Sequence, residues 1–144
     1  MGDEMFVGGF ASGFLAKGLM HIGYGLYFTT ARLMGIDVGK NGAGALGGTM
    51  AGFIQGQLMP KLSQEESDRT IASLDNMKDF EFSKDQISRI EIKKPGLMSS
   101  GHITITPITG SPEKISLRHR IAFDRLAQLT QVFCPDKVKI SKMV

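Results

Sequence analysis

Apolar and polar residues alternate along the second half of the chain, which is the pattern of β-strands that bury one face. In segment 87–94, Ile90 and Ile92 face one side of the predicted strand and charged residues face the other. The same period of two returns in two later segments, and turn signals rich in Pro, Gly and Ser separate the three. The pattern therefore predicts successive antiparallel strands, with a turn at 83–86, over the following ranges: 80–82, 87–94, 102–108 and 114–119.

The first half of the chain also predicts extended structure, from Phe6 to Asp37. Phe6, Phe10 and Phe14 recur every four residues, a spacing that fits one face of a strand or of a helix. The many glycines between them disfavour a helix, because glycine loses the most conformational freedom when the backbone is fixed. We therefore expect a first strand here, followed by two more at 22–28 and 31–37.

Two amphipathic helices are predicted, one in the middle of the chain and one near its end. Ser63 and Glu66 have the spacing of a capping box, which predicts a helix that begins there and runs to about Leu74. A stripe of apolar residues predicts a second helix over 121–133. A glycine-rich segment, 41–59, precedes the first helix and also has helical length.

These elements predict a mainly β protein of one domain, 1–144. About seven strands with one apolar face, antiparallel where short turns join them, form a small barrel or sandwich. The open end of such a barrel or sandwich must be covered. The terminal helix is the remaining element with a long apolar stripe, so we expect it to cover that end. With 42% apolar and 22% charged residues the chain is not a disordered tail. Its single cysteine, Cys134, indicates a reducing, cytoplasmic setting.

Two segments carry motifs that occur in a known family. One is the strand pair Tyr24-Gly-Leu-Tyr-Phe-Thr-Thr-Ala-Arg-Leu-Met-Gly-Ile36, and the other is the run from Asn76 to Gly96. They resemble the LYLTxxRL strand pair and the strand, turn, S-x-I-x-x-I-E-x-K-K segment of GRAM and pleckstrin-homology-like domains. The resemblance covers roughly 10–37 and 76–133. It leaves 38–75 as a helical insertion, of the Gly/Ala-rich kind that similar prokaryotic proteins carry.

The resemblance implies a pleckstrin-homology-like antiparallel barrel of about seven strands, capped by a C-terminal helix. It also implies a non-catalytic scaffold that binds lipids, peptides or other domains. Family members that bind phosphoinositides carry a cluster of Lys and Arg on the facing strands of the first hairpin. This chain has only Lys17 at that place, so phosphoinositide-specific recognition is not expected.

Positive charge is concentrated in the second part of the chain. Residues 1–59 carry three basic and three acidic side chains, so the net charge of +3 arises entirely from 60–144. This excess suits an acidic protein or an anionic membrane surface as the partner. It is too dilute to predict nucleic-acid binding. The expected location is the cytoplasm, with the membrane periphery as an open alternative.

No catalytic, metal or cofactor site is predicted. The three histidines lack the spacing of metal ligands, and no cysteine completes a zinc set. Cys134 follows a helix without an orienting motif, which favours a buried thiol over a nucleophile. The segment Gly42–Gly47 matches Gly-x-Gly-x-x-Gly, but the rest of a βαβ unit does not follow it. We therefore do not expect an enzyme.

Basic residues gather on the outward face of the predicted second-half strands. By alternation, Arg89 and Lys93 on one strand point to the same side as Lys114, Arg118 and Arg120 on another. Such a face would steer an acidic partner toward the chain. It would equally serve as the solvated face of a sheet, where edge lysines discourage aggregation.

The predicted turn after segment 87–94 combines cations with apolar residues. Lys93 and Lys94 precede a Pro-Gly pair, and Leu97 and Met98 follow it. This composition suits a membrane surface, with the cations among the headgroups and the apolar side chains below them. The alternative is that Leu97 and Met98 tuck under the rim of the barrel.

Glycines recur every four residues in the glycine-rich segment, at Gly44, Gly48, Gly52 and Gly56. On a helix they would form a smooth stripe that permits close backbone approach. The stripe suits packing within the chain, and it equally suits a second copy in a symmetric homodimer, where one self-complementary patch suffices.

These observations predict a binding or adaptor module of the PH/GRAM-like kind. It would engage an acidic protein or an anionic membrane surface and would self-associate. The alternative is a membrane-associated structural protein that inserts its glycine-rich segment into lipid. That alternative depends on 41–60, an uncharged run long enough to span a bilayer.

Overall fold

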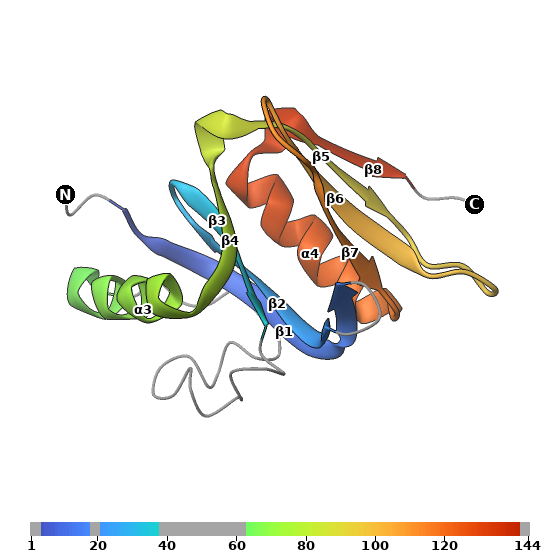
Figure 1. Ribbon diagram of the computed structural model, residues 1–144, viewed down its shortest axis with the longest axis horizontal. Helices are drawn as coiled ribbons and strands as arrows, with labels where there is room; N and C mark the ends of the chain where they lie inside the picture. Colours follow the sequence, from blue (N-terminus) through green and yellow to red (C-terminus); the bar gives the residue numbers. More distant parts are fainter. Residues whose placement is uncertain (1–3, 18–20, 38–62, 142–144) are drawn as a thin grey trace.

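The computed structural model describes residues 4–17, 21–37 and 63–141. These ranges hold eight strands and two α-helices, and Figure 1 shows one helix lying between the two halves of a strongly bent sheet. The elements are, in chain order, β1 (Phe6–Lys17), β2 (His21–Thr29), β3 (Arg32–Asp37), α3 (Gln64–Met77), β4 (Lys78–Ser83), η3 (Lys84–Gln86), β5 (Ile87–Lys93), β6 (Gly101–Pro107), β7 (Glu113–Leu117), α4 (Arg120–Phe133), η4 (Pro135–Lys137) and β8 (Val138–Ser141).

The strands form an open sheet in the order β4-β3-β2-β1-β7-β6-β5-β8. Neighbours are antiparallel except for β5 and β8, which run parallel. Strand β1 joins the two halves of the sheet, because it pairs with β2 along most of its length and with β7 at Leu15 and Ala16. Within the described residues no strand pairing connects β4 to β8, so the sheet does not close on itself.

The prediction of a mainly β protein with a covering C-terminal helix is confirmed, and the structure departs from the finer prediction of a barrel or sandwich of about seven strands in two details. The sheet is open rather than a closed barrel, and β8 adds a parallel strand beyond the expected seven. A turn of 3-10 helix that starts at Pro135 directs the chain back along β5. Val138 and Ile140 then pack against the core, and this burial holds β8 at the edge of the sheet.

The main core lies between the two halves of the sheet, where α4 covers it (Figure 1). The inward isoleucines of β5, β6 and β7 are buried, as the alternation predicted. On α4 the buried apolar side chains fall on one stripe, and Phe133 makes an edge contact with Phe28 of β2 at 5.4 Å between ring centres. Each fully buried large side chain contributes about 1.5–3 kcal/mol to stability.

A smaller core forms where α3 packs on the other side of the first strands. Ile71 and Leu74 of α3 are buried there with Tyr27 and Met34. The capping box is confirmed: the Glu66 amide donates to the Ser63 hydroxyl and the Ser63 amide donates to the Glu66 carboxylate. The helix continues beyond the predicted end at Leu74, to Met77, and the Asp75 carboxylate in its last turns accepts hydrogen bonds from Arg32 and Lys78.

An ion-pair cluster around Arg32 ties these elements together. The Arg32 guanidinium contacts Glu4 at 2.9 Å, Asp75 of α3 at 2.7 Å and Glu81 of β4 at 2.8 Å. Lys78 pairs with the same Asp75 and Glu81. The cluster therefore connects the segment before β1 with β3, α3 and β4.

Most of the predicted insertion, 38–75, lies outside the described residues, which include only 63–75 of it: Ser63 and most of α3. The glycine stripe at Gly44, Gly48, Gly52 and Gly56 therefore stays a prediction, as does the self-association that rests on it. Among the described helices none combines the length and apolar character needed to cross a membrane.

Candidate anion-binding surface

The hairpin that joins β5 to β6 projects from the body of the molecule (Figure 1). Its base is fixed from two sides. The Lys94 amide donates to the Ser141 carbonyl of β8 at 3.1 Å. At the start of β6 only glycine fits, because a Cβ on Gly101 would lie 2.2 Å from the carbonyl oxygen of Lys93. The turn between these points is thus held at a defined place.

The end of this hairpin presents two apolar side chains to solvent beside two lysines. Leu97 and Met98 are 104% and 97% exposed, so the alternative that they tuck under the rim of the sheet is wrong. Lys93 and Lys94 lie at the base of the same turn and are partly exposed. We call these four residues the tip. Adjacent exposed apolar side chains rimmed by charge are typical of an interaction site.

The structure brings most of the predicted basic face together. Arg89 and Lys93 of β5 and Lys114 of β7 point away from the core, because the isoleucines between them are buried. The register aligns Glu91 with Thr104 of β6, and Thr104 with Lys114. Glu91 lies 3.3 Å from the Arg89 guanidinium, so its charge is engaged on its own strand.

The prediction for the remaining two basic residues is partly wrong. Arg118 is exposed just after β7. Arg120 is the first residue of α4, not a strand residue, and its guanidinium forms a 3.9 Å ion pair with Asp124. The chain enters the helix at His119, whose Nδ1 accepts the amide of Ile121 and caps the first turn. Arg120 therefore follows the helix and not the alternation of β7.

Three polar residues of this face were missed by the sequence reasoning. His102 is aligned with Lys93 across β5 and β6, while Lys139 and Ser141 of β8 are aligned with Glu91 and Lys93. The signal for β8 was the alternation of Val138 and Ile140 with these two polar residues. A hollow of about 200 Å³ lies between the strands, and it is lined by Glu91, Ile92, Lys93, His102, Lys139 and Ser141.

The electrostatic environment of His102 is positive. Burial lowers the pKa of its imidazole, and the ammonium groups of Lys114 and Lys93 lower the pKa further, against the opposite effect of Glu91. In the described part of the chain no acidic side chain forms an ion pair with Lys93, Lys114 or Lys139. This face is therefore only partly paired and carries a net positive charge.

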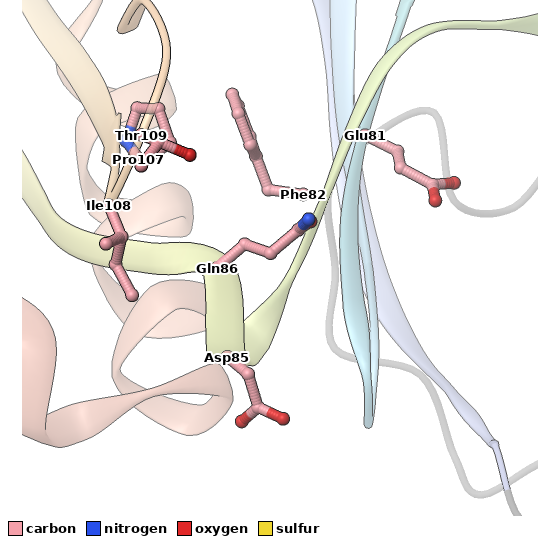
Figure 2. A pocket seen from close by; sticks show the side chains of 7 residues that line it. All are labelled: Glu81, Phe82, Asp85, Gln86, Pro107, Ile108 and Thr109. Carbon is pink, nitrogen blue, oxygen red and sulfur yellow. The ribbon is translucent and has the colours of Figure 1, made fainter.

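A second hollow, of about 280 Å³, lies between β4 and the β6–β7 turn (Figure 2). Figure 2 shows the carboxylates of Glu81 and Asp85 turned away from it. Glu81 is held by Arg32 and Lys78, and Gln86 accepts the Ser83 amide at 3.1 Å. The side chains that remain are mainly apolar, so the hollow offers no acid–base pair for catalysis.

The described residues offer little for other chemistry. They contain no group of three His, Cys, Asp or Glu side chains that could hold a metal ion. Cys134 is buried, and burial raises the pKa of its thiol, an environment typical of a structural cysteine.

Comparison with protein-family models, with curated proteins and with solved structures finds no match to this chain. The resemblance to pleckstrin-homology-like domains therefore stays a prediction.

Proposed function

We propose that this chain is a non-catalytic, PH/GRAM-like binding module that docks on an anionic membrane surface through the tip. The observation that carries the proposal is the full exposure of Leu97 and Met98 beside Lys93 and Lys94. No described part of the chain covers these apolar side chains in water. At a membrane they would enter the boundary between headgroups and acyl chains, while the lysines stay at headgroup level.

The magnitudes favour a reversible contact. Each lysine near an anionic leaflet contributes about 1 kcal/mol, and full burial of a Leu or Met side chain contributes about 1.5–3 kcal/mol. The four residues of the tip together supply about 5–8 kcal/mol, before the cost of association. Taken without that cost, this energy corresponds to a Kd between about 10⁻⁴ M and 10⁻⁶ M, and the cost of association makes the actual binding weaker. The partly paired basic face behind the tip adds long-range attraction.

An acidic protein is the other partner that the charge would suit. The membrane accounts better for the tip, because an acidic protein surface would explain the lysines but not the two exposed apolar side chains. Insertion of the glycine-rich segment into lipid depends on residues outside the described ranges, and the proposal does not use it.

Vesicle co-sedimentation tests the proposal. We expect the protein to bind phosphatidylcholine vesicles that contain phosphatidylserine, and to bind pure phosphatidylcholine vesicles much more weakly. Leu97→Ser with Met98→Ser should reduce binding at least tenfold. Charge reversal at Lys93, Lys94 and Arg118 should also weaken it and leave folding intact, because surface changes alter stability by less than about 0.5 kcal/mol.

The matched control is Ile108→Ser, since Ile108 is 66% exposed but lies on the turn after β6, away from the tip. It should bind vesicles as the wild type does. Equal binding by the tip variant and the wild type would contradict the proposal. Binding to a captured acidic protein with no binding to vesicles would replace the membrane by a protein partner.

A further inference from the structure

The hollow beside β8 has a defined set of side chains because the register fixes which residues share a face. Strand β5 lies between β6 and β8, and Lys93 is aligned with His102 on one side and with Ser141 on the other. Lys139 occupies the next outward position of β8, beside Glu91. The alternate residues of β5 and β8 are apolar and pack against the core. The polar ones therefore gather on the outer face.

The charge of the hollow suits an anion. The charged and titratable groups that line it are Glu91 and Lys93 of β5, His102 of β6 and Lys139 of β8, and the Lys114 ammonium of β7 acts electrostatically on His102. Glu91 is the only acid among them, and the Arg89 guanidinium engages it at 3.3 Å. Three ammonium groups remain without an acidic partner in the described part of the chain. An anion in the hollow would compensate them.

We propose that this hollow binds a phosphate monoester. The ammonium groups of Lys93 and Lys139 and the imidazole of His102 would donate to the phosphate oxygens, with the hydroxyl of Ser141 as a further donor. A volume of about 200 Å³ is below the range of about 300–1,000 Å³ that is usual for drug-sized ligands, so the hollow suits a small group. A phosphate monoester carries about 1.5–2 negative charges at pH 7 and three acceptor oxygens, which match this donor set.

A phosphate monoester occurs in two kinds of ligand, a lipid headgroup and a soluble phosphate ester. In the first case the inference rests on the proposed membrane contact, because the tip would bring the hollow to the headgroups. In the second case the hollow would work without a membrane. The experiment therefore has a soluble arm and a vesicle arm.

The soluble arm uses glycerol 3-phosphate and follows the titration of the His102 ring by NMR at constant ionic strength. A dianion beside the imidazole stabilises its protonated form, so the measured pKa of His102 should rise by about one unit at saturation. Lys139→Gln should weaken the response about tenfold. The matched control Arg69→Gln removes the same charge from the exposed side of α3 and should respond as the wild type does. An unchanged His102 titration in the wild type would overturn the proposal.

The vesicle arm compares phosphatidic acid, a lipid phosphate monoester, with phosphatidylserine at equal surface charge. A lipid source predicts tighter wild-type binding to phosphatidic acid, and Lys139→Gln should abolish that preference but keep binding to phosphatidylserine. The variant with Leu97→Ser and Met98→Ser should lose both vesicle contacts and keep the glycerol 3-phosphate response. If no vesicle binds but the NMR response is intact, the membrane function fails and the hollow stands as a site for a soluble phosphate ester.

Discussion

Replacing Arg32 by Met removes the centre of the ion-pair cluster and keeps most of the aliphatic volume. Exposed ion pairs contribute about 0.2–1 kcal/mol each, and loss of one partner of a buried pair costs about 3–5 kcal/mol. The Arg32 side chain is 16% exposed, while its three acidic partners are 27–38% exposed and screened by solvent. We therefore expect a loss of about 2 kcal/mol in the free energy of unfolding at pH 7.

The same variant should show a characteristic dependence on pH. Hydrogen bonds from Arg32 lower the pKa of Asp75. Burial alone would raise the pKa of Glu81, but hydrogen bonds from Lys78 and Arg32 outweigh it, so that pKa is also lowered. Carboxylates with lowered pKa values stabilise the fold above their unfolded pKa of about 4, and this contribution is lost as pH falls through the folded pKa. The Arg32→Met variant lacks part of this stabilisation at neutral pH. Its free energy of unfolding should therefore approach that of the wild type as the pH falls.

Urea unfolding followed by circular dichroism at pH 7, 5 and 3 measures this effect. The difference between wild type and Arg32→Met should shrink from about 2 kcal/mol at pH 7 to below about 1 kcal/mol at pH 3. Arg69→Gln, on the exposed side of α3, should stay within about 0.5 kcal/mol of the wild type at pH 7. A difference that is constant from pH 7 to pH 3 would refute the electrostatic reasoning and assign the loss to packing.

Two further predictions concern buried positions. A Cβ on Gly35 would lie 2.4 Å from the Phe80 ring, so Gly35→Ala should cost about 1–3 kcal/mol in urea unfolding. Gly96→Ala meets only the Ser99 hydroxyl at 3.3 Å and should be nearly neutral; equal losses would count against the steric argument. Cys134 is 5% exposed, so iodoacetamide should modify the native protein at least about tenfold more slowly than the urea-unfolded chain. Equal rates would show that the thiol is accessible.

The strands and helix starts were predictable because each has a local cause. The isoleucines of β5 and β6 alternate with polar residues, and only one side of the sheet faces the core, so period and burial agree. The start of α3 was predictable from Ser63 and Glu66, whose hydrogen bonds are made within a few residues of chain. The exposed tip was predictable in composition, since the lysines and the apolar pair are adjacent in sequence.

Features that depend on distant partners were not predictable. Strand β8 is short, and its pairing with β5 depends on where α4 delivers the chain. Without β8 the sequence could not place Lys139 and Ser141 beside Lys93, so the hollow at His102 was missed. The exposure of Leu97 and Met98 depends on how far the hairpin extends beyond the sheet. Composition alone fits both exposure and burial.

The pairing of β1 with β7 has a kinetic consequence. Within each half the antiparallel partners β1–β2, β5–β6 and β6–β7 are successive strands that close over short stretches of chain. In the sheet the two halves join where Leu15 meets Leu117, two residues that lie far apart in the sequence. This contact has a large sequence separation, and the entropy of closing so long a loop is lost before the contact contributes any stability. The folding rate should therefore be set at this junction, while the hairpins of each half form early.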